Sequence, residues 1–91
     1  RNPAFAAMTA EIEREVTGRL GDLFRSARDR GLVHPDVDPD SLALLVSTLG
    51  DGLFVRRAIS ERFDAERAMQ GVMAVIEAAC RGALRLPPLP S

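Results

Sequence analysis

Residue types that commonly carry chemistry are scarce in this sequence: its 91 residues include one cysteine, one histidine, and no tryptophan, tyrosine or lysine. A single cysteine excludes an internal disulfide and a zinc cluster built on cysteines, and it is typical of a protein kept in the reducing cytoplasm. The sequence also lacks an apolar run long enough to span a membrane and a recognisable signal peptide. These absences predict a cytoplasmic protein without a membrane partner.

The charges are close to balanced, which narrows the range of partners further. Twelve arginines stand against 13 acidic residues, and the isoelectric point is near 5.8. Proteins that bind nucleic acid usually have a basic face and a high isoelectric point. We therefore expect that these residues do not themselves contact DNA.

Apolar residues make up 46% of the sequence and are mainly leucine, alanine and valine. A chain of this length buries only ~60–65% of the surface that its unfolded form exposes, so it is marginally stable alone. Because the sequence starts at Arg1 inside an expected helix N-terminus, we interpret it as a processed chain or as part of a longer one. The apolar fraction exceeds what one small core can hide, which predicts that a partner covers some of the apolar surface.

Residues 31–40 contain the end of one helix and the start of the next. Gly31 favours the left-handed conformation that ends a helix, Asp38 is a good N-cap, and Pro39 fits the first helical position. Before this segment, apolar residues recur every three or four positions, which predicts a helix over about residues 3–30 with Asn2 as its cap.

The second predicted helix, over about residues 39–58, is apolar on two faces. One face carries Leu42, Leu45, Val46, Leu49 and Leu53. The other face, roughly opposite, carries Leu44, Thr48 and Val55. A helix with two apolar faces is buried on both of them, so we expect contacts on two sides of this helix.

Glycines interrupt both helices. Gly18 and Gly21 lie in the first, and Gly50 and Gly52 bracket Asp51 in the second. A glycine costs about 1 kcal/mol relative to alanine inside a helix, so its presence calls for a reason. In the first helix the apolar stripe keeps its phase across the glycines, which favours the close approach of another helix over a kink. The pair in the second helix also invites close approach.

Asp64 is expected to cap a third helix over about residues 64–84. The proline-rich tail, residues 85–91, cannot be helical and is expected to be extended or disordered. No strand-like alternation and no repeat occurs in the sequence. The predicted fold class is therefore all-α, with one domain of three amphipathic helices over residues 1–84.

Asp36, Asp38 and Asp40 alternate as the ligands at the start of a calcium loop do. The sixth position of such a loop is Ser41 instead of glycine, and the twelfth is Ser47 instead of glutamate. We therefore assign the three aspartates to turn and cap roles. No metal ion or cofactor is predicted.

Five other residues are candidate functional groups. His34 has no second histidine or nucleophile to act with, so we expect an exposed loop residue. Cys80 lies on an apolar stripe and is interpreted as a small buried hydrophobe, because a redox sensor needs exposure and a lowered pKa. Asp51 either reaches a cavity or a partner, or points outward. Arg56 and Arg57 either bind an acidic ligand or stabilise the helix C-terminus.

Large apolar residues at helical spacing are interpreted either as core or as the wall of a ligand pocket. They are Phe5, Met8, Phe24, Leu49 and Phe54. The sequence offers no cluster of polar residues that resembles a catalytic site, so we predict that the chain is not an enzyme.

The order of these features resembles the C-terminal part of TetR-family transcriptional regulators. The resemblance extends to about Leu84. It rests on Asn2-Pro3 at the start of the long helix, Leu23-Phe24 leading through Ala27 to Gly31, residues 35–40, the helix containing residues 49–53 and Arg57, and Phe63-Asp64 at the last helix.

The resemblance implies that these are the last three helices of a nine-helix regulator whose DNA-binding helix-turn-helix is absent from this segment. DNA would be bound only through that N-terminal domain. The last two helices would pair with those of a second copy in a dimeric four-helix bundle. For that homodimer the expected interface residues are Leu44, Thr48, Val55, Val72, Met73 and Ile76.

The resemblance also implies a small-molecule effector, held between the long helix, the penultimate helix and earlier helices. The candidate pocket walls are Phe5, Met8, Ile12, Leu49 and Phe54. Effector binding to one global state would shift the spacing of the DNA-binding heads and release the operator. The alternative hypothesis is a free-standing helical module for protein–protein interaction without an effector, which predicts that no DNA-binding segment precedes Arg1.

Overall fold

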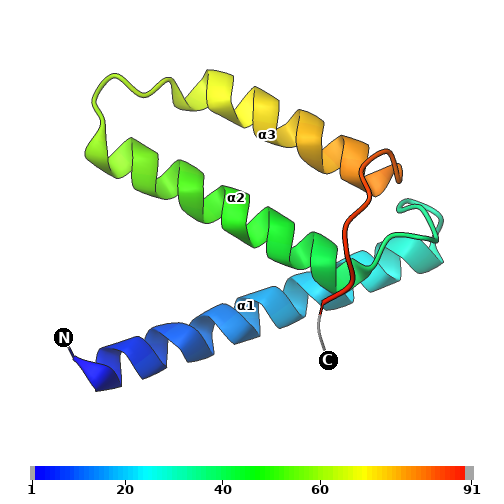
Figure 1. The fold of residues 1–91 in the computed structure, drawn as a ribbon, viewed down its shortest axis with the longest axis horizontal. Coiled ribbons are helices and arrows are strands. Elements are labelled where there is room, and N and C mark those ends of the chain that lie inside the picture. The colour runs from blue at the N-terminus through cyan, green and yellow to red at the C-terminus, as the bar shows by residue number, and fades with distance from the viewer. Residues whose placement is uncertain (1, 90–91) are drawn as a thin grey trace.

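The computed structural model describes residues 2–89, which form three helices: α1 (Pro3–Asp29), α2 (Pro39–Ile59) and α3 (Ala65–Cys80). No strand occurs in this range, so the predicted all-α class is confirmed. In Figure 1, α2 and α3 run antiparallel, and α1 crosses the beginning of α2 and diverges from it toward its own N-terminus. None of the described helices combines the length and hydropathy needed to cross a membrane.

Each helix starts at the cap that the sequence predicts. Asn2 Oδ1 accepts hydrogen bonds from the N–H groups of Ala4 and Phe5 at 3.0 and 3.3 Å. Asp38 Oδ2 accepts one from Ser41 at 3.1 Å, and Asp64 Oδ1 accepts one from Arg67 at 3.0 Å. These bonds satisfy N–H groups that have no partner within the helix.

The third helix ends at Cys80, four residues before the predicted end at Leu84. Gly82 adopts a left-handed conformation with φ of 78°. The Ala83 N–H donates to Ala78 O at 2.9 Å, a bond that bridges the helix end and closes a Schellman motif. The same geometry, with Gly31 at φ of 79°, ends the first helix where the sequence predicts.

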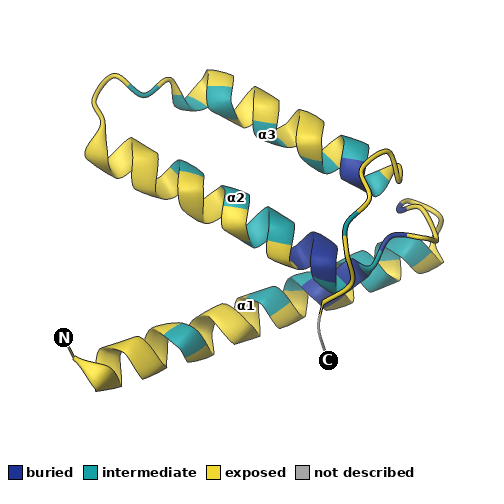
Figure 2. Ribbon diagram, in the orientation of Figure 1, coloured by how far each residue is buried: buried dark blue, intermediate teal, exposed yellow. Residues whose placement is uncertain are grey.

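The core lies where α1 and α2 cross. Val33, Val37, Leu42 and Ala79 are its buried members, at 4%, 5%, 0% and 0% exposure. Half-buried side chains pack around them: Phe24, Ala27, Leu45, Val46, Cys80 and Leu86. Figure 2 shows that burial is concentrated at this end of the fold and fades along each helix away from it.

Much apolar surface remains uncovered in this single copy. The exposed large apolar residues of the described range are Phe5, Met8, Ile12, Val16, Leu23, Leu32, Leu44, Phe54, Val55, Ile59, Met69, Met73, Val75, Leu84 and Leu89. Phe54 is 79% exposed, and Ile59 is 77% exposed. Apolar surface on this scale marks interaction sites, in agreement with the partner that the composition predicts.

The close approach predicted at the glycines occurs at Gly21 alone among the four. Gly21 is buried, and a Cβ built there would lie 2.5 Å from Asp40 Oδ1. At Gly18, Gly50 and Gly52, an added Cβ would meet nothing within 4 Å. For those three positions, no contact among the described residues accounts for the glycine.

The proline-rich tail has no helix or strand over residues 85–89, and in Figure 1 it crosses the beginning of α2. Leu86 packs against the core, and Ser41 Oγ donates a hydrogen bond to Pro87 O at 2.7 Å. The rest of the predicted tail, Pro90 and Ser91, lies outside the described residues.

Candidate functional site

The angle between α1 and α2 leaves a groove between the two helices on the open side of their crossing. It holds a cavity of about 230 Å³ lined by Thr9, Ile12, Glu13, Val16 and Thr17 of α1 and by Ser47 and Asp51 of α2. The α1 residues recur at spacings of three and four, which places them on one face of the helix. We call this cavity and its lining the α1–α2 groove.

The groove combines apolar walls with polar groups that can bind a ligand. Ser47 Oγ is buried and has no hydrogen-bond partner in the part of the chain that the structure describes. Leaving a buried hydroxyl unpaired costs about 1–3 kcal/mol, so a ligand that bonds to it recovers that energy. Thr9 differs, because its hydroxyl already donates to Phe5 O at 2.8 Å.

Contacts at the helix crossing hold the groove in place. Arg25 Nη2 lies 3.3 Å from Asp40 Oδ1 and 3.3 Å from Asp22 Oδ1. These carboxylates raise the pKa of the Arg25 guanidinium, chiefly through the hydrogen bond to Asp40. Arg28 Nη1 also donates to Val37 O at 3.3 Å. The two helices are therefore pinned at one end and free to diverge at the other.

A second hollow lies between α2 and α3 and is more open. Its volume is about 450 Å³, and its lining is Thr48, Leu49, Gly52, Leu53, Arg56, Phe63, Ala68 and Val72. Apart from Arg56 and the Thr48 hydroxyl, which donates to Leu44 O at 2.7 Å, the lining offers no polar side chain. The chemistry of this hollow is therefore that of an apolar packing surface.

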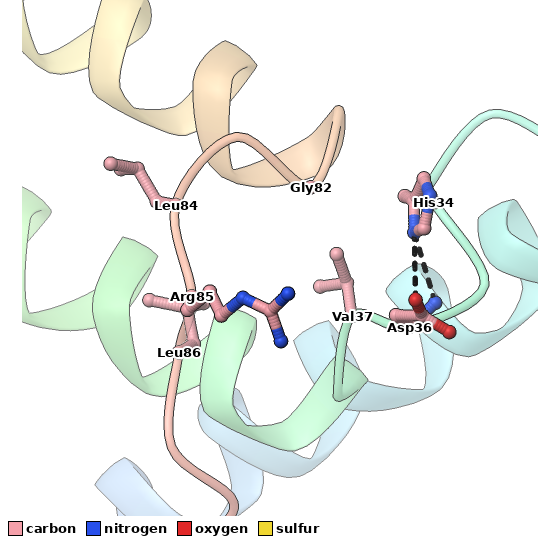
Figure 3. A pocket seen from close by; sticks show the side chains of 7 residues that line it. All are labelled: His34, Asp36, Val37, Gly82, Leu84, Arg85 and Leu86. Atoms are coloured by element: carbon pink, nitrogen blue, oxygen red, sulfur yellow. Dashed lines mark hydrogen bonds and ion pairs between the residues drawn. The ribbon is translucent and has the colours of Figure 1, made fainter.

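A third hollow, of about 290 Å³, lies where the α1–α2 loop meets the end of α3 (Figure 3). His34 Nδ1 accepts a hydrogen bond from the Asp36 N–H at 3.1 Å, which assigns the proton of the neutral ring to Nε2. The His34 N–H donates to Cys80 O at 2.8 Å, and the ring packs over Gly82. These contacts join the loop to α3, so His34 has a structural role in an exposed loop position.

The family described as BetI-type transcriptional repressor, C-terminal, matches residues 1–81 of the chain. The chain is a C-terminal domain of the TetR family. None of the curated proteins compared with it matches, and none of the solved structures does. The family consists of transcriptional regulators that act as DNA-binding dimers with small-molecule effectors. Its members are not enzymes.

The TetR-family domain does not gather the five predicted pocket walls into one cavity of the described residues. Ile12 lines the α1–α2 groove, whereas Leu49 lines the hollow between α2 and α3. Phe5 and Met8 lie on the exposed N-terminal half of α1, and Phe54 is an exposed residue of α2. A pocket built from all five remains a prediction that needs further helices.

The predicted dimer residues of the TetR-family domain differ in exposure. Leu44, Val55 and Met73 are 43%, 53% and 53% exposed. Thr48 is also exposed, whereas Val72 and Ile76 are half-buried. Their role in a dimer remains a prediction, and the exposed members are its most accessible part.

Sequence reasoning missed most of the groove lining of this TetR-family domain. Thr9, Glu13, Thr17 and Ser47 interrupt otherwise apolar helix faces, and a search for polar residues at such positions would have found them. Asp51 is a candidate functional residue from the sequence. It belongs to the lining of the α1–α2 groove and is exposed.

The other candidate groups have structural roles in the TetR-family domain. Asp38 caps α2, and Asp40 pairs with Arg25. No group of three or more histidine, cysteine, aspartate or glutamate side chains suited to a metal occurs within residues 2–89. Burial, with a smaller effect from Glu77, raises the pKa of the Cys80 thiol, which opposes the thiolate character of a redox sensor.

Proposed function

We propose that this TetR-family domain binds a small-molecule effector and forms a homodimer, and that the two events are coupled to release of operator DNA. The observation that carries the effector role is the α1–α2 groove, in which none of residues 2–89 forms a hydrogen bond with the Ser47 hydroxyl. A concave site with apolar walls and a few polar groups is the usual form of a small-molecule site. Helices that precede α1 in the regulator would close the groove, together with the predicted walls Phe5 and Met8.

The pinned crossing supplies a mechanism for the coupling. A ligand between the diverging parts of α1 and α2 changes the angle between them, because Gly21 and Asp40 hold the other end. A ligand shifts an equilibrium only by its difference in affinity for the two states. We therefore expect the effector to favour one interhelical angle, and the long α1 to transmit that angle toward the DNA-binding domain.

The dimer role rests on the exposed apolar residues of α2 and α3. Leu44, Val55 and Met73 remain uncovered in a single copy. In a two-fold dimer the same patch is used on both subunits, so a largely uncharged surface pairs with itself. We expect a cytoplasmic homodimer that contacts DNA only through the N-terminal domain of the regulator.

A ligand screen by thermal unfolding of the full-length regulator tests the effector role. A ligand present at 100 times its Kd stabilises the protein by about 2.7 kcal/mol, which is measurable as a rise in Tm. We expect a compound that raises the Tm of the wild type and not that of Ser47→Trp, in which the indole fills the groove. The matched control is Ser26→Trp, on an exposed position of α1 outside the groove lining. Equal binding to wild type and Ser47→Trp would show that the effector lies elsewhere.

A further inference from the structure

The C-terminal strap, which we define as residues 86–89, is fixed along α2 by a polar contact and an apolar one. Ser41 is buried at 6% exposure, and its Oγ donates to Pro87 O at 2.7 Å. Leu86 packs against the core. In Figure 1 the chain turns after α3, and this segment then passes the beginning of α2. The strap is therefore a defined part of the surface of α2.

The Ser41 hydroxyl joins the strap to the cap of α2. Its Oγ lies 2.8 Å from Asp38 Oδ2 as well as 2.7 Å from Pro87 O, and it has one proton to donate. Asp38 also accepts a hydrogen bond from the Ser41 N–H. Within residues 2–89, Ser41 carries the one α2 side-chain group that is hydrogen-bonded to the strap, so replacing it by alanine removes that bond while Asp38 keeps its backbone partner.

The strap and α2 enclose a groove of about 360 Å³ that contains no ionisable side chain. It is lined by Ser41, Leu44, Leu45, Thr48, Leu86, Pro87, Pro88 and Leu89. Both of its hydroxyls are already bonded, Ser41 as above and Thr48 to Leu44 O at 2.7 Å. No side-chain hydroxyl is left free for a polar ligand, so the groove suits an apolar occupant.

The groove between the strap and α2 is continuous with the proposed dimer surface, which identifies a second copy of the chain as its occupant. Leu44 and Thr48 belong both to the groove and to the exposed stripe of α2 that continues to Val55. Leu89, 40% exposed, lies beside them on the strap. A standard interface uses roughly 20–30 residues per partner. The six predicted dimer residues on α2 and α3 therefore need neighbouring residues to complete an interface of that size.

We propose that the strap is part of the homodimer interface, where Leu89 and Leu44 of one copy pack against apolar residues of the second copy. This proposal rests on the homodimer of the proposed function. Ser41 acts as a positioning residue, because it holds the strap on α2 and does not itself meet the partner. A tail released from Ser41 would lose conformational entropy on dimerisation and weaken the dimer.

Sedimentation equilibrium of the full-length regulator tests the proposal through the Kd of the dimer. We expect Leu89→Asp to raise that Kd at least about tenfold, because an unpaired carboxylate would be buried in an apolar contact. The matched control is Leu32→Asp: Leu32 is 65% exposed but lies in the α1–α2 loop, and we expect its Kd to stay within about twofold of the wild type. Ser41→Ala should raise the Kd by about threefold to tenfold, with an unchanged helical circular dichroism spectrum.

The outcomes separate this proposal from the dimer itself. If Met73→Arg dissociates the dimer while Leu89→Asp behaves like Leu32→Asp, the dimer stands and the strap proposal is overturned. A tighter dimer after deletion of residues 86–91 would also overturn it, because the strap would then compete with the second copy. If the wild type is a monomer, both proposals fall.

Discussion

Gly21 of α1 lies directly against Asp40 in the first turn of α2, so that a Cβ at position 21 would come 2.5 Å from Asp40 Oδ1. The same oxygen pairs with Arg25 Nη2 at 3.3 Å. The absence of a side chain at Gly21 therefore permits both the crossing of the helices and the ion pair beside it. Gly21 and Asp40 therefore mark the point of close approach from which the α1–α2 groove opens.

Substitution of Gly21 by alanine is expected to bring no net gain in stability, although alanine favours the helix. Alanine in a helix is worth about 1 kcal/mol over glycine, but here the new methyl group displaces the Asp40 carboxylate from Arg25. The matched control is Gly18→Ala, since an added Cβ there meets nothing within 4 Å. We expect the control to raise the free energy of unfolding by about 0.5–1 kcal/mol in urea titrations.

A double variant isolates the contact as the cause. Once Asp40→Ala has removed the carboxylate, Gly21→Ala should recover the gain seen at Gly18, about 0.5–1 kcal/mol. If Gly21→Ala stabilises the wild type as much as Gly18→Ala does, the Asp40 side chain does not fix the crossing.

Asp38→Ala is expected to lower the free energy of unfolding by about 1–2 kcal/mol. The Asp38 carboxylate accepts a hydrogen bond from the Ser41 N–H at 3.1 Å, and the Ser41 hydroxyl lies 2.8 Å from the same oxygen, next to the core. Asp36→Ala is the control, because its side chain is 92% exposed and caps no helix. Chemical denaturation of both variants measures the difference, and equal losses would argue against the cap as the source of the stability.

The helix boundaries could be predicted because they depend on local chemistry. The end of α1 at Gly31 and the start of α2 at Asp38 and Pro39 each follow from the conformational preference of one or two residues. The end of α3 follows the same rule, with Gly82 as the left-handed residue. The apolar residues Ala83 and Leu84 extend the predicted helix to Leu84, although Gly82 is a stop signal that is present in the sequence.

The α1–α2 groove could not be predicted from the sequence because it depends on the angle at which α1 and α2 cross. Ser47 and Thr17 are 30 positions apart, and the crossing of α1 and α2 brings them to one cavity. The pocket walls predicted from the sequence include both Ile12 and Leu49, which line different hollows in the structure. A helix apolar on several sides gives no sign of which neighbour each side meets, so the sequence could not separate them.

The Cys80 thiol is expected to make stability fall in alkaline solution. Burial raises its pKa in the folded state, so the folded protein retains the proton at pH values where the unfolded chain releases it. Stability from this group is full below the pKa of the unfolded thiol and is lost as pH rises through the folded pKa. Denaturation at a series of alkaline pH values should show this slope in the wild type and a weaker one in Cys80→Ala. Equal slopes in both proteins would exclude Cys80 as the source.

Met73→Arg is expected to convert the dimer into monomers without unfolding α3. Met73 is 53% exposed in the single copy, so its arginine can reach solvent in the monomer but is buried in the predicted interface. Val72 and Ile76 serve this purpose less well, because both are half-buried and an arginine at either position would also disturb the monomer.

Val75→Arg is the matched control for Met73→Arg, because the two positions point to opposite sides of α3 and Val75 is 38% exposed. Light scattering after size-exclusion chromatography should give half the wild-type mass for Met73→Arg and the full mass for Val75→Arg. Dissociation by Val75→Arg alone would move the interface to the other side of α3. Because Met73 and Val75 share one helix and differ only in direction, a difference between the variants reports the face of α3 that the second copy covers.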